Sequence, residues 1–189
     1  MHHYSLKACL ICAIGLATFG LGAHAEDSPL PRPDIEITRG VPFFPQKVMG
    51  CGPAALAGIL AYWDVPVTLE EITREVFNPR LKGALAMDLA LAAERRGLAA
   101  DSYSGNLDDL RRLILLHEPP IVFLNLNTRL FPQGHFVIVT GYDGPGAAVV
   151  AHTGIHPNER IPVAEFMKAW EKTGYWTVHI RPREKPVPS

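Results

Sequence analysis

The hydrophobic pattern of this 189-residue chain changes its period near residue 120. Upstream, apolar residues recur at helical spacing, and downstream they form the short apolar runs that are typical of strands. Helices are expected at 51–63, 69–77, 84–96 and 107–117, and strands at 121–126, 135–142, 147–151 and 175–180, with a short helix at 163–170 and an extended or strand segment at 41–44. This order predicts an α+β domain, with N-terminal helices packed on a C-terminal antiparallel sheet.

Local signals support the helix boundaries. Thr68 and Glu71 have the spacing of a capping box at the start of a helix. Asn106 is a typical N-cap residue, and Gly97 is a typical residue just beyond a helix end.

The first 25 residues have the pattern of an export signal. A short basic start precedes an apolar run at 8–22, and Ala23-His24-Ala25 offers a small-x-small cleavage site. The run is roughly 15 residues long, short of the ~20 that span a bilayer. We therefore expect a periplasmic or secreted protein that is cleaved near Ala25 and keeps no stable membrane anchor. An extended lead-in at 26–40, one domain at 41–181 and a flexible tail at 182–189 would follow.

The charge of the chain argues against one class of partner. The formal net charge is −1, and no basic cluster is present, which argues against nucleic acid as a partner. No cofactor or metal-binding motif is apparent in the sequence.

Cys51 is the strongest candidate for a functional residue. Cys9 and Cys12 lie in the export segment, so cleavage would leave a single cysteine in a compartment where cysteines are normally paired. The residue opens the helix expected at 51–63, where the helix dipole should lower the pKa of the thiol. Gln46 precedes it closely, and a side-chain amide there could donate to an oxyanion. The alternative is that Cys51 is only a small buried residue.

His135 is the candidate base. It opens the strongly apolar strand expected at 135–142, whose packing would hold the imidazole rigidly. Asp143 lies at the far end of this strand, where it more naturally starts a turn. If Tyr142 pairs with Ala147 across that turn, His152 lies opposite Val137 and on the same face as His135.

Two further residues, Asn158 and Glu159, are weaker candidates for the group that orients His135.

Two segments together resemble a known family. These are Gln46-x4-Cys51-Gly52-Pro53-Ala54-Ala55-Leu56 and the later Gly134-His135-Phe136-Val137-Ile138-Val139-Thr140-Gly141-Tyr142. They are similar to the papain-like bacteriocin-processing cysteine peptidases, which cleave leader peptides after a double glycine. The resemblance implies a papain-like fold and a peptide or protein substrate. It also implies Cys51 as nucleophile, His135 as general base and Gln46 as oxyanion-hole donor.

One position departs from this family. Its members usually complete the catalytic triad with an Asp-Pro pair, but the corresponding segment here is Ala151-His152-Thr153-Gly154. A neutral His152 could fix the tautomer of His135, although it would not supply a negative charge. We therefore expect an exported cysteine peptidase with Cys51, His135 and His152 in its site. The alternatives are a non-catalytic peptide-binding module on the same fold, transpeptidation by the same residues, and a metal site built from these three side chains.

Overall fold

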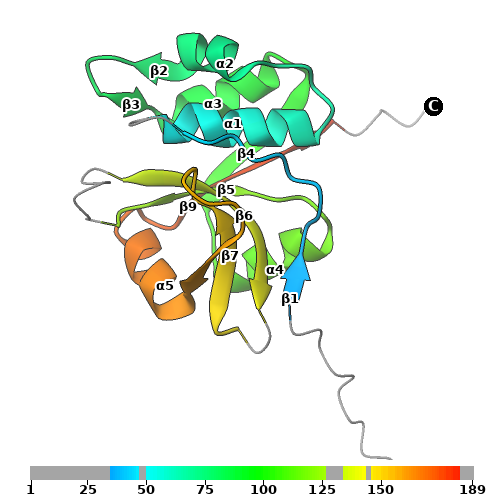
Figure 1. Ribbon diagram of the computed structural model, residues 1–189, viewed down its shortest axis with the longest axis vertical. Helices are drawn as coiled ribbons and strands as arrows, with labels where there is room; N and C mark the ends of the chain where they lie inside the picture. Colours follow the sequence, from blue (N-terminus) through cyan, green and yellow to red (C-terminus); the bar gives the residue numbers. More distant parts are fainter. Residues whose placement is uncertain (1–34, 47–49, 127–133, 144–145, 184–189) are drawn as a thin grey trace, which may run out of the picture. The chain divides into compact units, whose positions relative to one another are not determined.

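A computed structural model describes residues 35–46, 50–126, 134–143 and 146–183 (Figure 1). The helices are α1 (Cys51–Tyr62), α2 (Leu69–Val76), α3 (Ala86–Glu94), α4 (Leu107–Leu115) and α5 (Val163–Glu171). The strands are β1 (Ile35–Ile37), β2 (Phe77–Asn78), β3 (Gly83–Ala84), β4 (Leu98–Ser104), β5 (Ile121–Leu124), β6 (His135–Asp143), β7 (Ala148–His152), β8 (Glu159–Pro162) and β9 (Trp176–Pro182). The predicted signal segment and most of the predicted lead-in and tail lie outside these residues.

The main sheet is antiparallel, as the sequence predicts. Its strands follow the order β4-β9-β5-β6-β7-β8, and β1 pairs with the end of β6. The short strands β2 and β3 form a separate hairpin. The central strand β6 pairs with β5 near its beginning and with β7 and β1 near its end, so its first residue is held by pairing with Leu124 of β5.

Helices cover both faces of this sheet (Figure 1). Residues of α1, α2 and α3 form one core with Phe136 and Ile138 of β6. Residues of α4 and α5 form a second core with Val137 and Val139. Because successive side chains of a strand point to opposite faces, β6 is apolar at every position that meets a helix. The α+β class and the packing of helices on an antiparallel sheet are thus confirmed.

The helix α1 is buried along nearly its whole length, which explains its alanine-rich and uncharged sequence. Every residue from Gly52 to Leu60 is buried, so no polar face is needed. Gly58 lies against β6 and the preceding loop: an added Cβ there would stand 2.7 Å from Cδ1 of Ile138 and 2.9 Å from the carbonyl oxygen of Pro42. Close packing therefore fixes the position of α1, and of Cys51 at its start, relative to β6.

Several boundaries match the sequence signals. Thr68 and Glu71 form the predicted capping box, and the side chain of Asn106 accepts a hydrogen bond from the backbone N–H of Asp109. The helix α3 is shorter than expected, and residues 41–44 form no strand.

Four short strands and the longer β4 were not expected. The sequence of β4 lacks the apolar pattern of a buried strand, because β4 lies at the edge of the sheet and most of its side chains are partly buried or exposed. In the described part of the chain, no helix combines the length and apolar character needed to cross a membrane.

Candidate active site

Cys51 is the first residue of α1 and is half-buried. Its sulfur accepts hydrogen bonds from backbone N–H groups, including that of Phe136 in β6. Phe136 directly follows His135, so this contact joins the start of α1 to the start of β6. Burial raises the pKa of the Cys51 thiol above its ordinary value, and the hydrogen bonds from Phe136 and Gly52 only partly oppose this effect. The expectation that the helix start lowers this pKa is therefore wrong, because desolvation of the sulfur is the larger effect.

His135 is the first residue of β6 and is fully buried. Its Nε2 lies 2.5 Å from the backbone carbonyl oxygen of Thr153. A carbonyl can only accept, so Nε2 carries the proton and Nδ1 keeps its lone pair. Burial lowers the pKa of His135 to about 4, against the opposing influence of the Thr153 carbonyl and the charge of Glu159. The imidazole is neutral at pH 7 and presents a basic nitrogen.

His152 lies elsewhere than the sequence predicts. It pairs with Ile138 instead of Val137, because Tyr142 pairs with Val149 and an irregularity between Val139 and Gly141 shifts the register. The predicted pairing is therefore wrong, and Ile138 belongs to the face of β6 that meets α1.

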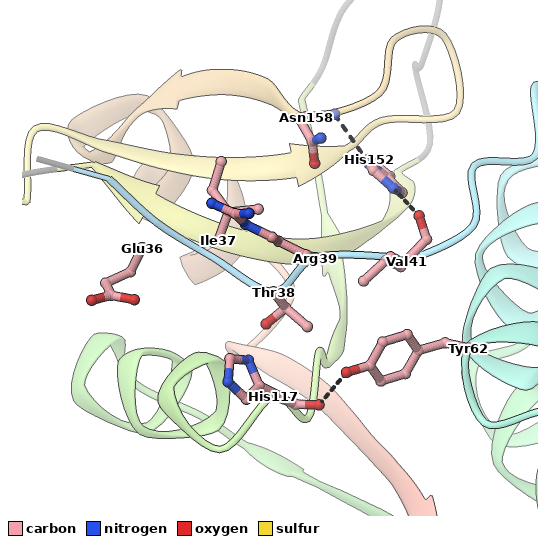
Figure 2. Close-up of a pocket in the computed structure, with 10 residues that line it drawn as sticks. Glu36, Ile37, Thr38, Arg39, Val41, Tyr62, His117, His152 and Asn158 are labelled. Atoms are coloured by element: carbon pink, nitrogen blue, oxygen red, sulfur yellow. Dashed lines mark hydrogen bonds between the residues drawn. The ribbon is translucent and has the colours of Figure 1, made fainter. Parts of the chain in front are cut away.

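The ring of His152 has two hydrogen-bond partners of its own. Its Nδ1 accepts from the backbone N–H of Asn158 at 3.0 Å, and its Nε2 donates to the carbonyl oxygen of Val41, also at 3.0 Å. Figure 2 shows the ring between these two partners. Phe43 packs edge-on against it, with the ring centroids 5.4 Å apart. His152 thus ties the segment before α1 to the loop between β7 and β8.

Gln46 reaches the same loop. Its backbone N–H donates to the carbonyl of Gly154 at 2.9 Å, and its Nε2 lies 3.4 Å from the Thr153 carbonyl oxygen. Gly154 has a φ of +79°, and a Cβ there would stand 2.6 Å from Cδ of Gln46. Glycine is therefore required at 154 both by its backbone conformation and by the Gln46 side chain.

Thr153 contacts both His135 and Gln46, although no feature of the sequence marks it. Its carbonyl oxygen faces both His135 and Gln46. The contact uses the backbone, so no choice of side chain at 153 marks it. Its position directly after a strand that lies beside β6 is the only hint.

Two hollows adjoin the site. A narrow pocket is lined by Cys51, His152 and Gly154 together with apolar side chains of the segment before α1 and of β6. A larger cavity of about 850 Å³ lies beyond His152 and is bordered by β1, the loop after it, Tyr62, His117 and Asn158 (Figure 2). His152 lines both, whereas Cys51 lines only the narrow pocket.

The alternative of a metal site built from Cys51, His135 and His152 has no support among the described residues. Within the described ranges, no three His, Cys, Asp or Glu side chains converge as ligands of a metal ion would, and Cys51, His135 and His152 form no such group.

A cysteine at the start of a buried helix, packed against an antiparallel strand that opens with a histidine, defines a papain-like cysteine peptidase domain. The comparisons with known proteins agree. The model of the peptidase C39 family matches residues 43–180. The chain belongs to the peptidase C39 family, and it is a cysteine-type peptidase.

Solved structures show the same fold. A double glycine motif protease from an AMS/PCAT transporter, crystallised with its leader peptide, is 28% identical with a TM-score of 0.61, over 78% of this chain and 97% of that one. The peptidase domain of the Streptococcus transporter ComA is 19% identical with a TM-score of 0.62, over 76% and 100%. A C39-like peptidase from Bacillus anthracis is 18% identical with a TM-score of 0.64, over 80% and 99%. No curated protein matches the sequence.

Proposed function

We propose that the chain hydrolyses peptide bonds through an acyl-thioester on Cys51, with His135 as general base. The observation that carries this proposal is that Cys51 and Phe136, the residue that follows His135, line the same narrow pocket. The backbone of Phe136 also lowers the pKa of the Cys51 thiol. The tautomer of His135, with its proton on Nε2, leaves Nδ1 able to accept a proton.

The resting pair is neutral. The raised pKa of Cys51 and the low pKa of His135 favour a thiol and an imidazole over an ion pair. Proton transfer to His135 then accompanies attack of the sulfur on the substrate carbonyl. As the C–N bond breaks, His135 returns the proton to the leaving amine, and water subsequently releases the acyl group from Cys51.

The developing oxyanion needs donors. The backbone N–H of Cys51 lies at the start of α1, where helix N–H groups have no partner within the helix. The Gln46 amide is the second donor. Its contact with the Thr153 carbonyl is long, at 3.4 Å, and a substrate oxygen would replace it at little cost.

The substrate class follows from the family and from the leader-peptide complex of one similar structure. We propose a peptide with a double glycine before the cleaved bond. Export of the chain, with cleavage near Ala25, is a proposal from the sequence alone; N-terminal sequencing of the protein from the periplasm or medium would test it.

The test is cleavage of a synthetic peptide with a double glycine, followed by mass spectrometry. Cys51→Ser and His135→Ala should each reduce kcat at least 10³-fold, a magnitude on the order of that for catalytic triad members. The control is His117→Asn, which changes an exposed histidine with a φ of +58° that asparagine tolerates. Cleavage that survives Cys51→Ser would refute the assignment, and cleavage at another sequence would refute only the substrate.

A further inference from the structure

A carboxylate contacts Thr153, the residue whose carbonyl orients His135. Glu159, the first residue of β8, pairs with Ala151 of β7, two residues before Thr153. The hydroxyl of Thr153 donates to Oε2 of Glu159 at 2.8 Å. The same residue therefore presents its carbonyl to the imidazole and its hydroxyl to the carboxylate.

The loop holds Thr153 firmly in this double role. The backbone N–H of Thr153 donates to the carbonyl of His156 at 3.2 Å, and the N–H of His156 donates to the Thr153 hydroxyl oxygen at 3.3 Å. These bonds orient the hydroxyl as well as the carbonyl. They fix Glu159 at the end of a short chain of contacts that begins at His135.

The charge of Glu159 reaches the imidazole. It raises the pKa of His135, in the same direction as the Thr153 carbonyl and against burial. Among the described residues, Glu159 is a charged side chain whose negative charge raises the pKa of His135. A carbonyl fixes the tautomer, but it has no net charge to stabilise an imidazolium.

The other candidates have other partners. Both ring nitrogens of His152 are occupied by Val41 and Asn158. The side chain of Asn158 accepts from the Thr140 hydroxyl at 2.9 Å. Asp143, at the far end of β6, pairs with Arg160.

We propose that Glu159, held by the Thr153 hydroxyl, supplies the negative charge that stabilises the His135 imidazolium during catalysis. Two groups would then share the function of a single triad carboxylate. The Thr153 carbonyl fixes the tautomer of His135, and the Glu159 carboxylate, which contacts Thr153 and not His135, supplies the charge. Glu159 is a positioning and electrostatic residue that touches neither substrate nor sulfur. This inference rests on the proposed roles of Cys51 and His135.

The test is the pH dependence of kcat/KM for Glu159→Gln, which keeps the shape of the side chain and removes its charge. Because Glu159 is exposed and screened by solvent, kcat/KM should fall by roughly two- to fivefold. The acid limb of the profile should move to lower pH, and the difference from wild type should shrink in 1 M salt. A purely structural role would produce neither the shift nor the salt dependence.

Three further variants sharpen the test. Glu165→Gln removes an exposed carboxylate in the first turn of α5 and should leave the profile unchanged. Thr153→Val, which keeps the carbonyl and loses the hydroxyl, should resemble Glu159→Gln, while Thr153→Ser should restore the wild-type profile.

The two possible failures are distinguishable. An unchanged acid limb in Glu159→Gln, with Cys51→Ser and His135→Ala inactive, would overturn the role of Glu159 alone. Activity in Cys51→Ser or His135→Ala would overturn the proposed function as well.

Discussion

His135 is a buried imidazole that the fold keeps neutral. Its ring is fully buried, its Nε2 proton points to the Thr153 carbonyl, and its pKa falls to about 4 from an ordinary value of 6.5. Cys51 shows the matching effect, because burial raises the pKa of its thiol. In the proposed mechanism the thiol and the imidazole are therefore both uncharged at rest, and the charges that catalysis needs arise when substrate is bound.

The pKa of His135 predicts how stability depends on pH. The unfolded chain binds a proton at this residue below pH 6.5, and the folded chain does so only near pH 4. The neutral His135 therefore contributes about 3 kcal/mol to the free energy of unfolding. This contribution is complete above pH 6.5 and is lost as the pH falls toward 4. Urea unfolding of His135→Gln should show a shallower loss over this window than wild type, and parallel curves would contradict the assigned pKa. His152 and His179, whose pKa values are also lowered, act equally in both proteins.

At the scale of elements, the sequence predicted those features that depend on neighbouring residues in the chain. The capping box of Thr68, the cap of Asn106 and the apolar length of α1 are local signals, and all are present in the structure. Cys51 and His135 were recognisable as candidates because each opens an element, α1 and β6 respectively. The β6–β7 register was not, because it depends on an irregularity near Thr140 that no residue type marks. The partner of His135 was hidden because it is a backbone carbonyl.

The packing of α1 on β6 gives a prediction at this scale. Gly58→Ala should destabilise the fold by roughly 1–3 kcal/mol, although alanine favours helices, because the new methyl group would meet the Pro42 carbonyl and Ile138. The shift of α1 should also lower kcat, since Cys51 moves with it. Gly83→Ala is the control, because its nearest neighbour is the carbonyl of Leu81, 3.9 Å away. A more stable or equally active Gly58→Ala protein would show that this contact is not close.

At the scale of the whole described domain, helices on both faces of one sheet bring together residues that are far apart in sequence. Gln46 comes from the segment that leads into α1, and Cys51 is the first residue of that helix. His135 and Glu159 come from the sheet, and Thr153 comes from the loop between β7 and β8. His152 contributes by joining these parts, since it bonds to Val41 on one side and to Asn158 on the other.

This joining role predicts a loss of stability without a change in chemistry. His152→Leu would leave the Val41 carbonyl and the Asn158 N–H without their partner, at a cost of roughly 2–4 kcal/mol in unfolding free energy. Any loss of kcat/KM should leave the acid limb of the pH profile in place. A shifted acid limb would instead indicate that His152 acts directly on His135.

The central claim, a thiol at Cys51 activated by His135, is tested most directly by mass spectrometry after treatment with a peptide electrophile whose sequence ends in a double glycine. The adduct should form on Cys51 in the wild-type protein and should form far more slowly in His135→Ala. An adduct on another residue, or equal labelling of Cys51 in both proteins, would contradict the account.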